Sequence, residues 1–255
     1  MLLLSSLCLA GNRWAGKKVA VLGDSISDSI RVGTKKCWWE MLSDSLDLQT
    51  ICYAKNGWTI EGMQKQAQWM LDEEKNSGRK FDLILLFGGT NDFNSQLPLG
   101  EFYALEKATV SRNGKPIESM RRVLNFDNGT FCGRLNRLLS TLKNNCPDAR
   151  IVMLTPIHRG FAKFSDTNEQ PEETWANGID LFLDDYINKM VEASRLWAVP
   201  LLDLNVQCEL YPVSPAYDGF VNKTDTDRLH PNTEGHKRMA YTLAYQLLGY
   251  PAKLD

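Results

Sequence analysis

The hydrophobic positions of this chain alternate between short apolar runs and longer amphipathic stretches. Short uninterrupted apolar runs are typical of strands buried on both faces, and longer segments of helical period are typical of the helices that cover them. The predicted strands are Val19–Leu22, about Leu48–Ala54, Leu83–Phe87, Ile151–Leu154 and about Val199–Leu204. The predicted helices run over roughly Lys35–Ser45, Ile60–Asn76, Cys132–Asn145, Ile179–Trp197 and Glu234–Leu248.

Strands that alternate with helices predict an α/β fold with a parallel sheet. We expect a three-layer α/β/α sandwich whose flavodoxin-like sheet has five parallel strands in the order 2-1-3-4-5. In such sheets the ligand site lies beyond the carboxyl ends of the strands. The loops that follow the first three strands are therefore expected to lie side by side.

The domain organisation is predicted to be simple. Residues 1–16 form an N-terminal extension, and residues 17–250 form one domain with insertions near 95–128 and 158–177. Within the first insertion, Asn113-Gly114 between apolar residues predicts a β-hairpin, which we expect to be small and near the mouth of the site. Insertions of this length are commonly lids or binding loops.

Composition narrows the classes of function. A length of 255 residues with 43% hydrophobic content suits one large domain, and a net charge of -2 gives no basic footprint for a nucleic-acid partner. The six cysteines are too sparse to predict a disulfide framework or a metal site, although disulfides remain open. The sequence contains no apolar segment long enough to span a membrane.

The N-terminal segment MLLLSSLCLA has two interpretations. It resembles the end of a signal-peptide core, but it is short and no Lys or Arg precedes the apolar run. It is equally well explained as the start of a strand or helix. The sequence therefore supports a secreted or periplasmic location and a cytoplasmic location equally.

Polar clusters follow each of the first three predicted strands: Gly23-Asp24-Ser25, then Asn56-Gly57-Trp58-Thr59, then Gly88-Gly89-Thr90-Asn91-Asp92. A hydroxyl in the first cluster would stand at the open end of the sheet. Glycine lets backbone approach a ligand closely, and an asparagine amide is a hydrogen-bond donor. Taken alone, each cluster is also explained by an ordinary turn with capping residues.

Asp227 and His230 lie three residues apart, on an expected turn before the last helix. At this spacing the carboxylate can bond one ring nitrogen and leave the other free to accept a proton. The other histidines are His158 and His236. A lone histidine is more often structural, but an aspartate at this spacing favours a functional role. Together the four clusters supply the nucleophile, base, orienting carboxylate and oxyanion donors of an acyl-transfer site.

These residues resemble the SGNH, or GDSL-type, hydrolase family, which is named for Ser, Gly, Asn and His. The matching residues are Ser25, Gly57, Asn91 and His230, and the resemblance runs from about Val19 to about Leu248. Ile26 replaces the Leu of the GDSL name, and the two insertions lie outside the shared motifs.

The resemblance implies a serine esterase with an acyl-enzyme mechanism. Ser25 would be the nucleophile, His230 the general base and Asp227 the residue that orients it. The N–H groups of Ser25 and Gly57 and the amide of Asn91 would form the oxyanion hole. No metal or organic cofactor is implied.

Further residues are expected to have supporting roles. Trp58 and His158 are candidates for the substrate pocket, Asp24 and Asp92 are expected to brace their turns, and His236 is expected to pack inside the last helix.

The substrate stays open between several classes. Aromatic residues in and near the insertions suit stacking on a sugar, which favours a short-chain or carbohydrate O-acetyl esterase; the same rings would also line the acyl pocket of a lysophospholipase or thioesterase. A non-catalytic ligand-binding domain is a further alternative, but it leaves Asp227 and His230 unexplained and lacks a G-x-G-x-x-G or Walker motif. The expected partner is a small-molecule or glycan ester, and the oligomeric state is left open.

Overall fold

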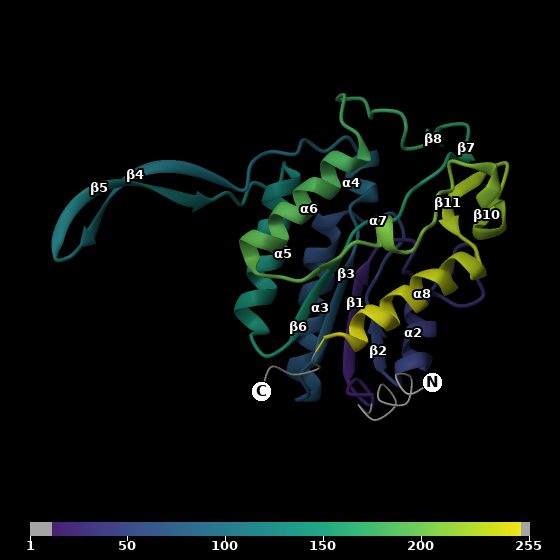
Figure 1. Ribbon diagram of the computed structural model, residues 1–255, viewed down its shortest axis with the longest axis horizontal. Coiled ribbons are helices and arrows are strands. Elements are labelled where there is room, and N and C mark those ends of the chain that lie inside the picture. The colour runs from purple at the N-terminus through teal and green to yellow at the C-terminus, as the bar shows by residue number, and fades with distance from the viewer. Residues whose placement is uncertain (1–11, 251–255) are drawn as a thin grey trace, which may run out of the picture.

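A five-stranded parallel sheet forms the centre of the computed structural model, which describes residues 12–250. The strand order is β2-β1-β3-β6-β9 (Figure 1). The strands are β1 (Lys18–Gly23), β2 (Gln49–Cys52), β3 (Leu83–Phe87), β6 (Arg150–Leu154) and β9 (Leu201–Leu202). Every residue of β1 and β3 is buried, as their unbroken apolar sequences predict.

Helices cover both faces of this sheet. On one face lie α3 (Ile60–Ser77), α5 (Phe131–Asn145) and α6 (Leu183–Trp197), and on the other lie α2 (Trp38–Leu46) and α8 (Thr233–Leu248). Side chains alternate along β1, so that Ala20 and Leu22 join the first core while Val19 and Val21 join the second. The predicted α/β fold with a five-stranded parallel sheet is confirmed.

The strand labels differ from the expected 2-1-3-4-5 because the chain forms further strands outside this sheet. Two of these strands lie between β3 and β6 and two between β6 and β9. The expected order numbers only the buried apolar runs, whereas the additional strands, among them the predicted hairpin, are short or exposed.

A second, four-stranded sheet has the order β10-β11-β7-β8. It consists of β7 (Ala162–Ser165), β8 (Asn168–Gln170), β10 (Val221–Lys223) and β11 (Asp227–Pro231). The turn expected around Asp227 and His230 is therefore the strand β11, which pairs with β10 and β7. The remaining short helices are α4 (Thr90–Asn94), α7 (Leu204–Gln207) and the 3-10 helix η1 (Pro215–Phe220).

The predicted hairpin is present but is neither small nor close to the site. Strands β4 (Tyr103–Arg112) and β5 (Lys115–Leu124) pair over their full length around Asn113-Gly114. The hairpin projects from the body on the side of α5 and α6, whereas β11 lies at the opposite side (Figure 1). The prediction of its place failed because a turn motif specifies only the local chain reversal.

The start of the described chain belongs to the core. Trp14 is buried, and its indole N–H donates to the Leu247 carbonyl at 2.8 Å. Residues 1–11, to which the export-signal prediction refers, lie outside the described residues. Within residues 12–250, five cysteines are free and no helix is long and apolar enough to cross a membrane.

Candidate active site

A buried glutamine fixes the turn after β1 through two hydrogen bonds. The Gln66 side chain accepts a hydrogen bond from the Gly23 N–H and donates one to the Gly23 carbonyl, both at 2.8 Å. A Cβ at Gly23 would lie 2.7 Å from the Phe87 carbonyl oxygen, so only glycine fits beside β3 here. This anchoring sets the direction in which Asp24 and Ser25 leave the strand.

Three side chains predicted for the site meet at this turn. The Ser25 hydroxyl lies 2.9 Å from His230 Nε2, although the two residues are 205 positions apart. His230 Nδ1 lies 3.0 and 2.9 Å from the two carboxylate oxygens of Asp227. The imidazole therefore connects the hydroxyl to the carboxylate, the order that activation of a serine requires.

Further contacts hold Asp227 in place. The Asn222 amide donates to Asp227 Oδ2 at 2.7 Å, and the His230 N–H donates to Oδ1 at 3.1 Å. Burial acts to raise the pKa of Asp227, but the hydrogen bonds from His230 and Asn222 outweigh it and leave that pKa below its ordinary value. The carboxylate thus stays ionised beside the imidazole.

The turns after β1, β2 and β3 each carry an N–H group with a hydrogen that is not used by the part of the protein that the structure describes. Gly57 has a φ of +75°, and no atom lies within 4 Å of the position that a Cβ would take. Within residues 12–250, the N–H groups of Ser25 and Gly57 donate to no other protein group. The Asn91 amide donates one hydrogen to the Trp58 carbonyl at 3.0 Å, which orients the amide and leaves its second hydrogen unused.

Two buried carboxylates connect the turns to one another. Asp28 accepts from the Asn56 N–H at 2.7 Å and so fixes the residue before Gly57. Asp92 accepts from the Ile60 N–H at 2.9 Å and from the Arg134 guanidinium at 3.2 Å. Burial raises the pKa of Asp92 to about 6 in spite of these donors.

Arg134 and Arg159 connect the turns to the surrounding helices and loops. Arg134 also donates to the Thr59 hydroxyl at 3.3 Å, so one guanidinium holds the turns after β2 and β3. Arg159, buried in the second insertion, donates to the Thr90 hydroxyl at 3.3 Å, and burial lowers its pKa to about 10. The sequence analysis missed both arginines because their partners lie 42 to 75 residues away.

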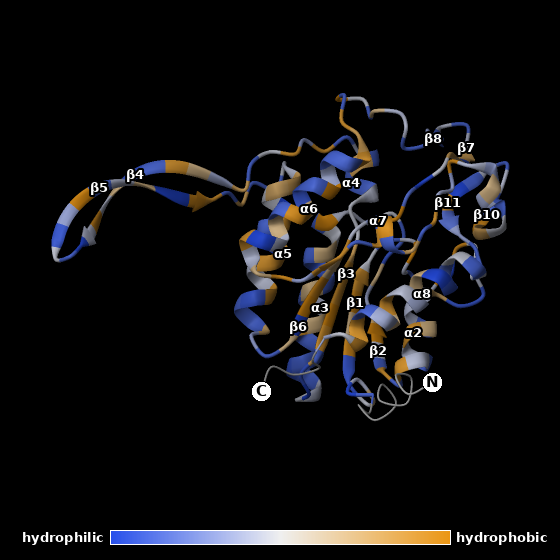
Figure 2. Ribbon diagram, in the orientation of Figure 1, coloured by the Kyte–Doolittle hydropathy of each residue, from blue (hydrophilic) through white to orange (hydrophobic). Residues whose placement is uncertain are grey.

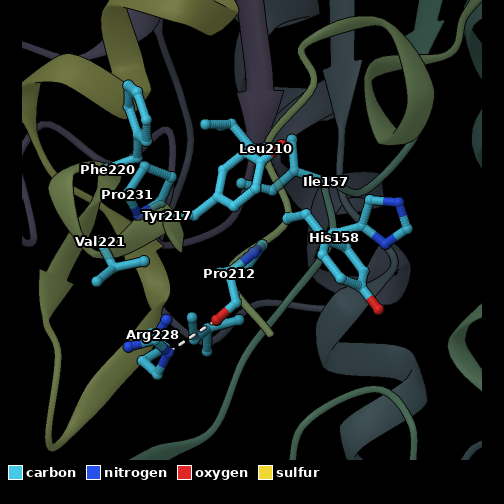
Figure 3. Close-up of a pocket in the computed structure, with 11 residues that line it drawn as sticks. Ile157, His158, Leu210, Pro212, Tyr217, Phe220, Val221, Arg228 and Pro231 are labelled. Atoms are coloured by element: carbon cyan, nitrogen blue, oxygen red, sulfur yellow. Dashed lines mark hydrogen bonds between the residues drawn. The ribbon is translucent and has the colours of Figure 1, made fainter. Parts of the chain in front are cut away.

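His158 lies apart from the triad. Its Nδ1 bonds the Glu173 carboxylate at 2.5 Å, which raises the pKa of His158. Its ring sits at the edge of an apolar pocket, on the far side from Arg228 (Figure 3). The free space in that pocket is about 10 Å³, room for roughly one water molecule.

Trp58 and His236 have roles in packing. The Trp58 ring lies against Trp69, with the ring centroids 5.3 Å apart, and contributes its carbonyl to the Asn91 contact. His236 accepts from the Trp38 N–H at 3.2 Å, and burial lowers its pKa to about 3. His236 is therefore a neutral core residue.

An exposed ring lies against the His230 imidazole. Phe164 in β7 lies edge-to-face on His230, with the centroids 5.6 Å apart, and remains 45% exposed. The second insertion thus reaches the site through Phe164 and Arg159. Phe164 is one of the aromatic residues of the second insertion, and only the pairing of β7 with β11 places it on His230.

A parallel α/β sheet with a serine, histidine and aspartate joined at one edge is typical of hydrolases. The profile of the GDSL-like lipase/acylhydrolase family matches residues 21–238. The chain belongs to this family.

Several solved structures share the fold. A protein from Lactobacillus plantarum has a TM-score of 0.71 at 25% identity, with 92% of this chain and 98% of that chain covered. A possible lipase from Chitinophaga pinensis has a TM-score of 0.65 at 20% identity, covering 91% and 98%. The acetyl xylan esterase AlAXEase has a TM-score of 0.54 at 18% identity, covering 90% and 99%. No curated protein gives a significant match.

The first prediction concerns Asp24, whose Oδ2 is buried without a hydrogen-bond partner. Burial raises its pKa from 3.8 to about 7. Below pH 3.8 the carboxyl is neutral in both the folded and the unfolded protein, so its contribution to the free energy of unfolding is fully present. This contribution is lost as the pH rises from 3.8 through about 7, because the unfolded chain ionises more readily than the folded one. Asp24→Asn should therefore become progressively more stable than the wild type over this interval, as measured by urea unfolding at several pH values.

Asp166→Asn is the control, because the Asp166 side chain is fully exposed. Its unfolding is measured at the same pH values as the reference for Asp24→Asn. A pH-independent difference between Asp24→Asn and the wild type would show that the Asp24 carboxyl does not titrate in this interval.

The second prediction concerns Arg134, whose side chain is 13% exposed while that of Asp92 is 0% exposed. Arg134→Ala leaves a buried carboxylate without its cation, which should reduce the free energy of unfolding by about 3 kcal/mol. Adding Asp92→Asn should recover part of this loss.

Lys237→Ala serves as the matched control, because it breaks an exposed pair with Glu234 and should cost less than about 1 kcal/mol. Urea unfolding measures all four proteins. Equal losses for Arg134→Ala and Lys237→Ala would contradict a clamping role for Arg134.

Proposed function

We propose that this chain is a serine esterase that hydrolyses short-chain carboxylic esters, with O-acetylated carbohydrates as its substrate class. The observation that carries this proposal is the 2.9 Å contact between the Ser25 hydroxyl and His230 Nε2, backed by Asp227. A nucleophile, its base and an orienting carboxylate in hydrogen-bond reach form the minimum set for acyl transfer.

In the first half of the reaction, His230 Nε2 takes the Ser25 proton as the serine oxygen attacks the ester carbonyl carbon. The negative charge on the carbonyl oxygen is stabilised by the N–H groups of Ser25 and Gly57 and by the Asn91 amide. Collapse of this intermediate breaks the ester C–O bond, and His230 returns the proton to the departing alcohol. Asp227 stabilises the imidazolium that exists between these steps.

In the second half, a water molecule gives a proton to His230 and attacks the acyl-enzyme. Collapse releases the carboxylic acid, and the proton on His230 restores the Ser25 hydroxyl. Each open oxyanion donor contributes on the order of 3 kcal/mol to the lowering of the barrier. Every step uses groups of this chain and water.

Two features support an acetylated carbohydrate. The exposed face of Phe164 beside His230 offers a flat apolar surface next to the scissile bond, the kind of platform on which a sugar ring stacks. AlAXEase, which shares this fold, is an acetyl xylan esterase.

The third prediction tests the nucleophile. Ser25→Ala should lower the rate of p-nitrophenyl acetate hydrolysis by at least about 1,000-fold and should abolish labelling by a fluorophosphonate probe. Ser45→Ala, at an exposed position of α2, should retain activity and labelling. Near-full activity in a folded Ser25→Ala protein would exclude Ser25 as the nucleophile. If the wild type neither hydrolysed the ester nor reacted with the probe, a binding function would be favoured.

The fourth prediction tests the substrate class. Phe164→Ala should raise the KM for acetylated xylo-oligosaccharides about fivefold or more, because a stacking contact is lost, and should change p-nitrophenyl acetate hydrolysis much less. Tyr245→Ala, an exposed aromatic residue on α8, is the control. Equal losses on both substrates would assign Phe164 to positioning of His230, and preference for lysolipids or acyl thioesters would exclude the carbohydrate.

A further inference from the structure

The hairpin formed by β4 and β5, Tyr103–Leu124, is called the arm from here on. It extends away from the body as a two-stranded ribbon (Figure 1). An isolated two-stranded hairpin is at best marginally stable in water, whereas three or more strands with a hydrophobic face are stable. The arm therefore has the form of an element that is completed by a partner.

Apolar side chains of the arm point into solvent. Leu105 is 61% exposed, Met120 54%, Val110 43% and Ile117 38%. Hydrophobic stretches alternate with hydrophilic ones along both strands (Figure 2). Apolar side chains gathered on one projecting element indicate an interaction surface.

The charge of the arm is opposite to that of the rest of the chain. Five basic and two acidic residues give the arm a net charge of +3, so the remaining residues carry -5. The acidic residues are Glu106 and Glu118, and the basic residues are Lys107, Arg112, Lys115, Arg121 and Arg122. Two arms therefore carry like net charges, so a pairing between them depends on how individual acidic and basic residues align across the strands.

The outer edge of β5 is able to accept a further strand. Asn113 and Gly114 have φ values of +52° and +75°, as a two-residue hairpin turn requires. Arg112 and Lys115, which flank this turn, then form a hydrogen-bonded pair. Because inward and outward groups alternate, Glu118, Met120 and Arg122 present their backbone N–H and C=O groups to solvent.

We propose that the arms of two copies of this chain pair through β5, antiparallel, across a two-fold axis at Met120. In this register Glu118 of one copy lies opposite the partner's Arg122, and Arg122 lies opposite the partner's Glu118. Ile117 lies opposite the partner's Val123. Opposite charges and apolar side chains that face one another across strands stabilise a sheet, and the product is a four-stranded sheet.

Three other registers are less complementary. An axis at Arg121 would place two arginines opposite each other, and pairing of the β4 edges about Lys107 would do the same with two lysines. An axis at Ser119 would place Ile117 opposite Arg121 and form no charge pair. The Met120 register also brings Lys115 and Asn113, at the tip of the arm, opposite the partner's Asn125 and Asp127 at its base.

The experiment uses charge reversal in the full chain, with sedimentation velocity at micromolar concentration. The wild type should be a dimer. Glu118→Arg and Arg122→Glu each place like charges opposite each other twice, so each should weaken the dimer at least tenfold. An equimolar mixture of the two variants should form a heterodimer, because both cross-strand pairs then carry opposite charges.

The double variant Glu118→Arg with Arg122→Glu should dimerise as the wild type does. Asp166→Arg makes the same charge change at an exposed site on the β7–β8 turn and should leave the dimer unchanged. Circular dichroism confirms that each variant is folded. Hydrolysis of p-nitrophenyl acetate reports on the triad separately, so failure of the esterase proposal is distinguishable from failure of this one.

A monomeric wild type at these concentrations would overturn the proposal. So would a dimer that survives both single reversals, or a mixture of the two variants that stays monomeric. Binding of a monomeric wild type to anionic lipid vesicles through the arm would assign the arm to an anionic surface and would equally overturn the pairing of two copies.

Discussion

The contact between the Ser25 hydroxyl and the His230 imidazole joins the end of the first strand to the segment before the last helix. Two sets of contacts, formed by residues far apart in the sequence, fix its geometry. Gln66 holds the turn that carries Ser25, while Asn222 and the pairing with β7 hold the strand that carries Asp227 and His230. The two sets of contacts belong to different sheets, because Ser25 follows β1 of the parallel sheet whereas β11 belongs to the four-stranded sheet.

Asp24 and Asp92 are buried near this contact, and burial is the largest influence on the pKa of each. Asp24 and Asp92 have pKa values raised to about 7 and about 6, respectively. Arg134 and Arg159 bind the turns through hydroxyl and carboxylate groups instead of being left in solvent. The turns that carry Ser25, Gly57 and Asn91 are thus fixed by charged groups, and in the proposed reaction a fixed donor would stabilise developing charge more strongly than water does.

The two insertions serve different ends of the molecule. The segment around 158–177 reaches the site, where Arg159 anchors it to Thr90 and Phe164 contacts His230. The segment around 95–128 turns outward and exposes the edges of two strands. Substrate choice and association with a second copy would therefore be set by separate parts of one chain, which allows either to vary while the triad is kept.

The amino-acid sequence by itself determined the core of the fold and the members of the candidate site. Unbroken apolar runs such as Leu83–Phe87 predict buried strands from local composition alone, and the motifs around Ser25, Gly57, Asn91 and His230 are contiguous in sequence. Only the tertiary structure decided that Arg134 holds two turns, that His158 pairs with Glu173 away from the triad, and that the arm points outward. These features rest on contacts between residues far apart in sequence or on the direction of a rigid element in space. Neither leaves a periodic pattern or a fixed spacing along the chain.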